Sequence, residues 1–262
     1  MIRAIDKGVR RKGVVTSRYP AERYEPHQGH MGAPGLDPSR CKAVGACVRS
    51  CPTAAITLVE GRPSFDLGSC IFCGECARAC PEGAIRMTKD FELASRTREG
   101  LWRTAAPGGT PSLERSGREL EAKIRKAFGR SLSIREVDGG SCNGCEVEVN
   151  SLTNAVHDIE RFGLHIVASP RHADVLLVTG PVTRNMEHPL LQAYHAAPDP
   201  KLVMAMGACA CSGGPFKDSY ATCDGVDKVL PVDVYIPGCP PRPQAVIHAF
   251  MVAVEKIQAR RE

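Results

Sequence analysis

The sequence has few aromatic residues and no long hydrophobic run. Aromatic side chains make up 5% of the 262 residues, so the basic residues do not accompany the stacking platform of a nucleic-acid-binding protein. The longest apolar stretches, at 173–178 and 245–254, are far shorter than the roughly 20 residues that cross a bilayer. Residues 1–20 are basic and polar and lack the apolar core of a secretory signal. We therefore expect no nucleic-acid partner, no transmembrane segment and no secretion.

The net charge of +5 is small, but the positive charges are unevenly distributed. Against a single acid, Asp6, residues 1–18 carry Arg3, Lys7, Arg10, Arg11, Lys12 and Arg18. Pro and Gly recur up to residue 40, so we expect residues 1–40 to form an extended arm. Two interpretations stay open. In the first, the arm is solvated; in the second, it binds a neighbouring subunit or lies near anionic lipid.

Cysteine, by contrast, is abundant. The chain has 13 cysteines, an odd number, and they are gathered into short motifs. A disulfide framework in a small secreted domain disperses its cysteines in even numbers. The pattern therefore predicts reduced thiols in an intracellular redox protein.

One cysteine run matches an iron–sulfur signature in full. The segment Cys70-Ile-Phe-Cys73-Gly-Glu-Cys76-Ala-Arg-Ala-Cys80-Pro81 fits the bacterial ferredoxin pattern C-x₂-C-x₂-C-x₃-C-P. In two-cluster ferredoxins the fourth cysteine of each run ligates the other cluster. One [4Fe-4S] cluster is therefore predicted on Cys51, Cys70, Cys73 and Cys76. Zinc is the alternative, but zinc sites favour separate C-x-x-C pairs over this tight run with a second copy beside it.

The companion run, Cys41-Lys-Ala-Val44-Gly-Ala-Cys47-Val-Arg-Ser-Cys51-Pro52, lacks one ligand. Val44 stands where the other run has Cys73, which leaves Cys41, Cys47 and Cys80 for the second cluster. Three thiolates suit a [3Fe-4S] cluster, and the pattern resembles that of seven-iron ferredoxins. Two alternatives stay open: an oxygen or nitrogen ligand completes a cubane, from His27, His30 or Asp37, or the cluster is lost and the cysteines only pack.

The positions of Gly and Pro, and changes in the residue pattern, predict how the chain is divided into segments. Residues 41–90 are expected to form an α+β ferredoxin-like domain with strands at 56–59 and 85–87. Residues 91–129 are expected to hold a linker, at 91–110, and a packing helix, at 112–128. From residue 130 to 262, strands alternate with helices as in an α/β parallel sheet of the flavodoxin-like kind. The predicted strands are 132–137, 164–168, 175–179, 202–205 and 234–236, and the predicted helices are 148–162, 187–196 and 243–258.

The loops that follow these strands carry the remaining motifs. In open parallel sheets the working site lies beyond the carboxyl ends of the strands. Three of the loops there carry cysteine, beside glycines that allow close backbone approach. They predict a further [4Fe-4S] cluster on Cys142, Cys145, Cys209 and Cys239. The leftover Cys211 and Cys223 are interpreted as small buried side chains.

The motifs Cys142-Asn-Gly-Cys145-Glu146, Gly207-Ala-Cys209 and Pro237-Gly-Cys239-Pro-Pro-Arg-Pro243 resemble a known family. They are similar to the small electron-transfer subunit shared by [NiFe] hydrogenases and respiratory complex I. Residues 1–90 resemble the two-cluster ferredoxin-like subunit of the same assemblies, so the chain looks like a fusion of the two. The complex I subunit has adjacent cysteines in its first loop, whereas Cys142 and Cys145 are separated by two residues. That spacing favours the energy-converting, membrane-bound hydrogenases of group 4.

The resemblance implies an oxidoreductase subunit that conducts electrons. The catalytic nickel–iron site is expected on a partner large subunit, together with other peripheral-arm subunits and a membrane arm. Soluble ferredoxin, or a formate or CO dehydrogenase module, is the expected electron donor. The expected location is the cytoplasmic side, peripheral to the membrane. No catalytic residue is expected on this chain, although Glu146 is either helix N-terminal charge, like Glu148, or a proton relay.

Two alternative functions stay open. One is the equivalent subunit of a complex I-like quinone or ferredoxin oxidoreductase that lacks nickel. The other is an assembly module whose clusters only hold the fold, which the number of predicted clusters argues against. The scattered histidines show no ligand spacing and are expected to be structural or on the surface: His157, His165, His172, His188, His195 and His248.

Overall fold

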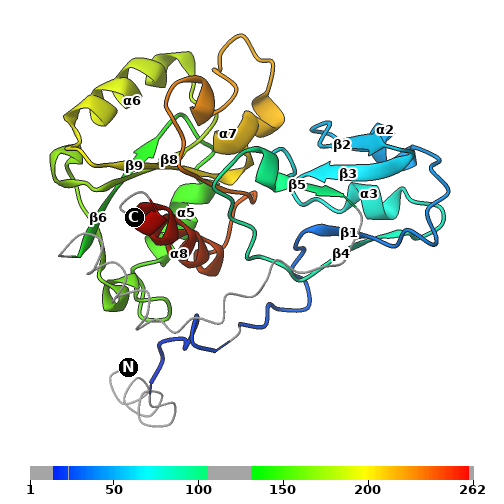
Figure 1. Cartoon of the computed structure of the whole chain (residues 1–262), viewed down its shortest axis with the longest axis horizontal. Coiled ribbons are helices and arrows are strands. Elements are labelled where there is room, and N and C mark those ends of the chain that lie inside the picture. Colours follow the sequence, from blue (N-terminus) through cyan, green and yellow to red (C-terminus); the bar gives the residue numbers. More distant parts are fainter. Residues whose placement is uncertain (1–13, 23, 105–130, 260–262) are drawn as a thin grey trace, which may run out of the picture.

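A five-stranded parallel sheet is the centre of the larger of two units in the computed structural model, which describes residues 14–22, 24–104 and 131–259 (Figure 1). Its strands are β6 (Leu132–Asp138), β7 (Leu164–Ile166), β8 (Val175–Thr179), β9 (Leu202–Met206) and β10 (Val234–Ile236). The spatial order is β10-β9-β8-β6-β7, with every neighbouring pair parallel. This is the 2-1-3-4-5 order of flavodoxin-like sheets. The predicted parallel α/β sheet is confirmed.

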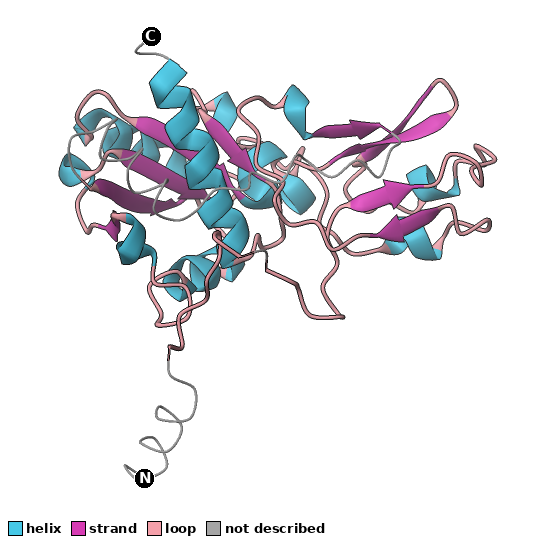
Figure 2. Cartoon of the chain, turned by 60° about the horizontal axis from the view of Figure 1, so that its bottom comes forward, coloured by secondary structure: helices cyan, strands magenta, loops and turns pink. Residues whose placement is uncertain are grey.

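Helices cover both faces of this sheet (Figure 2). They are α5 (Gly144–Ser151), α6 (Arg184–Ala196), α7 (Gly207–Ser212) and α8 (Pro243–Ala259), with short 3₁₀ turns at Ile159–Phe162, Pro170–His172, Gly214–Phe216 and Val226–Lys228. Strand β8 is buried on both sides, as parallel strands are. Val175 and Leu177 share a core with Phe250 of α8, whereas Leu176 shares the opposite core with Leu190 of α6.

The predicted helix at 148–162 is wrong at both ends. Helix α5 begins at Gly144 and ends at Ser151, and only a 3₁₀ turn follows at Ile159–Phe162. The side chain of Asn154 accepts hydrogen bonds from the backbone N–H groups of residues 156 and 157, and Asp158 has a left-handed backbone. Such local side-chain bonds compete with the helix ladder and turn the chain.

The smaller unit is antiparallel. Strand β1 (Pro34–Leu36) pairs with β4 (Ile85–Met87), while β3 (Arg62–Asp66) lies between β2 (Ile56–Val59) and β5 (Trp102–Thr104). Two four-residue helices, α2 (Ala46–Arg49) and α3 (Glu75–Arg78), follow the cysteine loops. The strands predicted at 56–59 and 85–87 are confirmed, and β1, β3 and β5 were not predicted.

The predicted linker at 91–110 contains regular structure at the end of its described part. Residues 99–101 form a 3₁₀ turn, and β5 then adds to the small sheet. Before that, Ser95 exchanges two backbone hydrogen bonds with Tyr235, of 3.0 and 2.8 Å, at the free edge of β10. Residues 95–104 therefore connect the three-stranded sheet of the smaller unit with the five-stranded sheet of the larger one. The helix predicted at 112–128 lies outside the described residues.

The described part of the N-terminal arm lies on its own chain. Arg161 donates to the carbonyl oxygens of Ser17 and Tyr19 at 2.6 and 2.8 Å, and the Tyr19 hydroxyl donates to Glu92 at 2.7 Å. From the other unit, Lys89 donates to the carbonyl oxygens of residues 27 and 30. Residues 14–22 and 24–30 therefore bridge the two units of one chain, and the basic residues at 1–13 lie outside the description.

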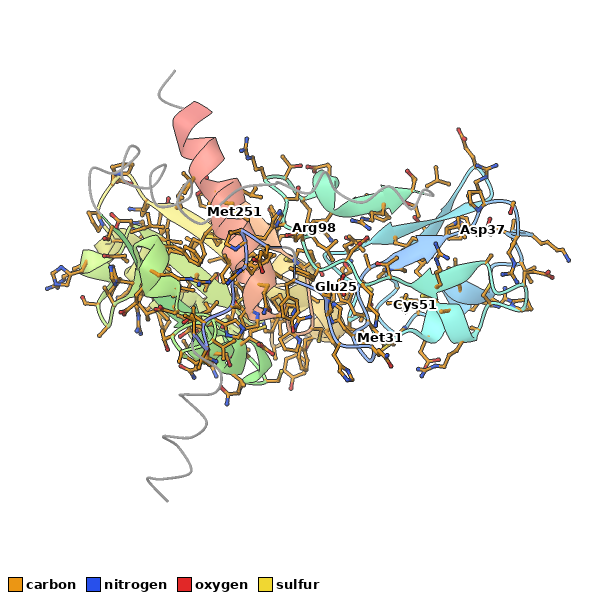
Figure 3. All side chains as sticks on the ribbon, turned by 90° about the horizontal axis from the view of Figure 1, so that it is seen from below. Glu25, Met31, Asp37, Cys51, Arg98 and Met251 are labelled. Carbon is orange, nitrogen blue, oxygen red and sulfur yellow. The ribbon has the colours of Figure 1, made fainter. Side chains whose placement is uncertain are left out.

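A buried ion pair stands at the junction of the two units. Arg98 binds both carboxylate oxygens of Asp66, at 2.6 and 2.5 Å, and lies between the units in Figure 3. Ser212 of α7 donates across the junction to the carbonyl oxygen of Gly68 at 2.9 Å. Burial alone would raise the pKa of Asp66, but the hydrogen bonds from Arg98 and Ser69 outweigh it and hold that pKa below its usual range.

Among the helices that the structure describes, none combines the length and the apolar character that crossing a membrane requires.

We predict that Arg98→Met destabilises the fold strongly, because it leaves the Asp66 carboxylate buried without its cation. Breaking such a pair costs about 3–5 kcal/mol, which corresponds to a fall in Tm of about 10 °C. The lowered pKa of Asp66 keeps the carboxylate charged above about pH 4, so the stabilisation is full and constant between about pH 5.5 and 8. Anaerobic thermal unfolding measures the shift. Glu22→Gln is the control, because its pair with Arg18 is exposed; an equal loss in both variants would contradict the prediction.

Candidate iron–sulfur sites

The two cysteine loops of the smaller unit have the same backbone. Ala43 and Phe72 both have φ of 55°, and Gly45 and Gly74, at the starts of α2 and α3, have φ of 72° and 76°. Glycine is the residue that adopts such a left-handed conformation at little cost. Each loop therefore wraps its cysteines around a hollow in the same way.

One hollow is lined by all four cysteines of the complete predicted set. Cys51, Cys70, Cys73 and Cys76 line it together with apolar residues, among them Pro34, Ile56, Phe65 and Met87. Backbone N–H groups point at the sulfurs: Ala55 donates to Cys51 Sγ at 3.2 Å and Phe72 to Cys70 Sγ at 3.3 Å. Thiolate sulfurs in iron–sulfur sites accept such hydrogen bonds, which tune the reduction potential. The donor set and the cavity fit a four-iron cluster.

The second hollow is lined by Cys41, Cys47 and Cys80, with Val44 among them. Ala84 donates to Cys80 Sγ at 3.3 Å, as Ala55 does to Cys51 in the first hollow. None of the proposed substitute ligands His27, His30 and Asp37 lines this cavity.

The third predicted set meets at the carboxyl edge of the large sheet. Cys145 lies in α5 and Cys209 in α7, while Cys142 and Cys239 lie exposed in the loops. A thiolate at any of Cys142, Cys209 or Cys239 would raise the pKa of Cys145, so the four thiols lie near one another. Gly207, with φ of 91°, lies so close that a Cβ atom there would stand 2.7 Å from Cys145 Sγ.

The thiols are strongly desolvated. Burial raises the pKa of Cys76 to about 11 and that of Cys70 and Cys209 to about 12, and it raises the pKa of Cys145 as well. Without a cation these groups stay protonated at neutral pH. Thiolates are the form that binds metal, so metal binding must release protons and becomes weaker as the pH falls.

The three sets stand in a row. Cys47 of the three-cysteine set is near enough to Cys76 for a thiolate at Cys47 to raise the pKa of Cys76. Cys73, on the other side of the complete set, interacts in the same way with Cys239 of the large unit. The complete set is therefore the middle one.

Across the described parts of the chain, no three His, Cys, Asp or Glu side chains gather closely enough to hold one metal ion.

A cavity of about 250 Å³ lies at the junction beside Cys239. Phe72, His30 and Arg242 line it, and the Arg242 guanidinium lies 4.5 Å from the centre of the Tyr24 ring. Burial lowers the pKa of His30, and Arg242 and Lys89 lower it further. The cysteine motif at 237–242 supplies part of the lining, but the sequence did not indicate a cavity, because the rest of the lining comes from distant segments.

A buried carboxylate, that of Glu146, stands next to the third set. Both oxygens of Glu146 are buried without a hydrogen-bond partner among the described residues. Glu136 of β6 is close to it, because the pKa of Glu136 is raised by burial and then by the charge of Glu146. Glu136 was not predicted from the sequence. Its one signal in the sequence is a charged residue within a predicted strand.

The remaining cysteines lie away from the three sets. Cys211 is fully buried and donates to the carbonyl oxygen of Ala205, and Cys223 is buried against Glu187 and Arg184. Their interpretation as buried side chains is confirmed. His248 is buried, and His157 bonds the carbonyl oxygen of Ser151 and the side chain of Gln244, so both are structural.

Comparison with known proteins finds two family models. The family described as NADH ubiquinone oxidoreductase, 20 Kd subunit, matches residues 142–253, and the 4Fe-4S dicluster domain matches residues 33–90.

Three curated relatives illustrate the similarity. Formate hydrogenlyase subunit 7 of Escherichia coli is 48% identical over 57% of this chain and 60% of its own length. The probable membrane-bound hydrogenase subunit mbhJ of Pyrococcus furiosus is 47% identical over 52% of this chain and 81% of its own. An NADH-quinone oxidoreductase subunit of a Roseiflexus species is 46% identical over 51% of this chain and 50% of its own. The chain thus spans only part of the length of some relatives.

A solved structure is also similar in sequence. A chain of the membrane-bound sulfane sulfur reductase, an archaeal respiratory membrane complex, is 40% identical over 52% of this chain and 75% of that one, with a TM-score of 0.46.

We predict that Gly207→Ala abolishes metal binding at the third set, because its Cβ would stand within 2.7 Å of Cys145 Sγ. Iron and sulfide analysis and EPR of anaerobic protein should show one cluster fewer than the wild type. Gly61→Ala is the matched control, since Gly61 also has a positive φ, of 76°, but no atom within 4 Å of the added Cβ. Both variants carry backbone strain of about 1–3 kcal/mol. Equal iron content in Gly207→Ala and the wild type would show that the close approach is unimportant.

Proposed function

The chain belongs to the family of the NADH ubiquinone oxidoreductase 20 Kd subunit, and we propose that it carries electrons to a partner subunit of a membrane-bound [NiFe] hydrogenase. The observation that carries this proposal is the row of three cysteine sets, linked through Cys47 with Cys76 and through Cys73 with Cys239. A structural cluster needs no neighbour, whereas an electron path needs each centre close to the next.

The proposed cofactors are two [4Fe-4S] clusters and a third, three-iron cluster. The four-iron clusters are assigned to Cys51, Cys70, Cys73 and Cys76, and to the set Cys142, Cys145, Cys209 and Cys239. The three-iron cluster is assigned to Cys41, Cys47 and Cys80. When bound, such clusters accept and release single electrons over a wide range of potentials. The protein supplies the thiolates, the backbone N–H donors at Ala55, Phe72 and Ala84, and the low-dielectric surroundings.

We assign the two units of the chain to two different types of domain. Residues 33–90 are assigned as a two-cluster ferredoxin-like domain, and the 131–259 unit as the hydrogenase small-subunit type, fused in one chain. The bridging arm and the Ser95–Tyr235 pairing support a fixed arrangement of the two. A fixed arrangement keeps Cys73 beside Cys239, which the electron path requires.

A large subunit is the proposed partner at the third set. Cys142 and Cys239 are exposed, so a partner that covers them would exclude water from this end of the path. The nickel–iron centre would lie in that subunit. We place the complex at the cytoplasmic face of the membrane, where thiols stay reduced, with a soluble ferredoxin or a formate or CO dehydrogenase module as donor.

Glu146 is proposed as a proton relay beside the third set, together with Glu136. Burial, and then the charge of Glu146, raise the pKa of Glu136, so Glu136 holds a proton at a higher pH than an exposed acid does. That arrangement suits a group that delivers protons where electrons arrive.

A complex I-like oxidoreductase is the second candidate. The similarity to the NADH-quinone oxidoreductase subunit from Roseiflexus, 46% identical, favours it. The two-residue gap between Cys142 and Cys145 favours the hydrogenase type. A partner large subunit without two C-x-x-C pairs able to hold nickel and iron would decide for the second candidate and would leave the electron path intact.

We predict that Cys239→Ser in the assembled complex removes the cluster of the third set and stops turnover. Cys239 is the only cysteine of its loop, so no neighbour can replace it. The EPR signals of the smaller unit should persist, because its cysteines are untouched. Cys223→Ser, at a buried cysteine outside all three sets, is the control and should keep both the iron content and the activity. Full activity in Cys239→Ser would refute its assignment as a ligand.

A further inference from the structure

The cavity of about 250 Å³ at the junction of the two units has no part in the proposed electron path. The structure describes all 13 cysteines, and Cys239 alone among them lies in the lining. The cavity is therefore not the space between the four thiols of the third set. Pockets for drug-sized ligands usually measure about 300–1,000 Å³, so this cavity suits a molecule of a few carbon atoms.

Arg242 brings a positive charge to this cavity. Its Nε donates to Gln244 at 3.0 Å and its Nη2 to the Tyr24 hydroxyl at 3.1 Å. The guanidinium carbon lies 4.5 Å from the centre of the Tyr24 ring and 5.5 Å from that of the Phe91 ring. Among the described residues, no carboxylate forms an ion pair with the guanidinium, and Nη1 has no hydrogen-bond partner. The group is therefore held in place with one donor edge free.

The acids around the cavity leave the charge of Arg242 available. Asp90 is the one acid in the described lining, and its carboxylate pairs with Arg103 at 3.2 Å. Glu148 lies near Arg242, since burial raises the pKa of Glu148 and the charge of Arg242 lowers it, but Glu148 does not line the cavity. A ligand in the cavity therefore meets an unpaired cation.

His30 is a second polar group in the lining. Its side chain makes no hydrogen bond with the described residues, although its Nε2 is buried. Burial lowers the pKa of His30, and the charges of Arg242 and Lys89 lower it further, so the ring is neutral at pH 7. A neutral imidazole carries one N–H and can donate it to an oxygen atom. Two cations and an uncommitted donor favour an anion in the cavity.

Most of the remaining lining is apolar. Met31, Ile71, Phe72 and Leu93 belong to it, together with the prolines of residues 237–241. Met31 is 46% exposed, so the cavity reaches the surface of the protein there. Apolar walls with a few placed polar groups are typical of small-molecule sites. A short hydrocarbon chain would be buried against these walls, whereas a bare inorganic anion would leave them without contact.

We propose that the junction cavity binds a short-chain carboxylate. A planar carboxylate matches the geometry of a guanidinium, so its oxygens accept from Arg242 Nη1 and from His30. The hydrocarbon tail packs against Phe72 of the smaller unit and Pro241 of the larger unit. Because the walls belong to both units, a bound carboxylate stabilises their arrangement. Binding requires neither electron transfer nor a partner subunit.

Fluorine NMR of the full-length, anaerobic, cluster-loaded protein tests the site, with trifluoropropionate as the probe. We expect the protein to speed the transverse relaxation of the fluorine signal, and unlabelled propionate to reverse the effect. Trifluoropropanol is the matched control probe, because it has the same tail without the charge and should relax far less. Equal relaxation of the alcohol would overturn the proposal, as would displacement of the probe by inorganic phosphate but not by propionate.

Variants locate the binding. Arg242→Gln should weaken binding of trifluoropropionate about tenfold or more, because a hydrogen bond to a charged group is lost. Arg242→Lys keeps the charge and should retain part of the affinity. Met31→Trp should block binding by filling the cavity from its exposed side. Arg171→Gln, at an exposed arginine outside the lining, is the matched control and should bind as the wild type does.

The iron content of each variant shows whether it has folded with its clusters. Unchanged binding in a folded Arg242→Gln or Met31→Trp protein overturns the carboxylate site. A wild-type protein that carries its clusters and binds no probe does so too, and it leaves the proposed electron path intact. Loss of turnover in Cys239→Ser tests that path separately.

Discussion

The rest of the structure depends on keeping Cys73 close to Cys239 across the junction of two units. Electron transfer between metal centres slows steeply with distance, so an electron path fails if the units drift apart. Several contacts of different kinds hold this junction: the pair of Arg98 with Asp66, the backbone pairing of Ser95 with Tyr235, and the arm that both units bind. Backbone pairing at a sheet edge fixes position as well as contact, which a side-chain pair alone does not do.

Burial of the thiols is the second constraint, and it ties folding to the metal. The pKa values of Cys70, Cys76 and Cys209 are raised by burial, so the hollows favour neutral thiols until iron is present. Binding of a cluster then replaces protons with metal in a low-dielectric site. The same burial keeps water from the sulfurs, which is one means by which a protein sets a cluster's potential.

Much of this arrangement could be predicted from the sequence, because thiolate spacing is a direct chemical signal. Spacing grouped the cysteines of the smaller unit into the two sets that line its hollows, and apolar runs located the strands of the parallel sheet. The failures have local causes. Asn154 turns the chain after α5 through its own side chain, β3 carries Pro63 within a strand, and β5 forms only because β3 offers a free edge. Glu136 was not predicted because Glu146 approaches it only in the folded chain.

Magnetic coupling between the clusters tests the central claim most directly. In fully reduced, anaerobic protein, pulsed EPR can measure how strongly each four-iron signal is affected by the neighbouring clusters, including the integer-spin reduced three-iron cluster. The row of cysteine sets predicts that the middle cluster, on Cys51, Cys70, Cys73 and Cys76, couples to both neighbours and that the outer two couple most weakly to each other. Four-iron signals without any coupling, or strongest coupling between the outer two clusters, would contradict the electron path.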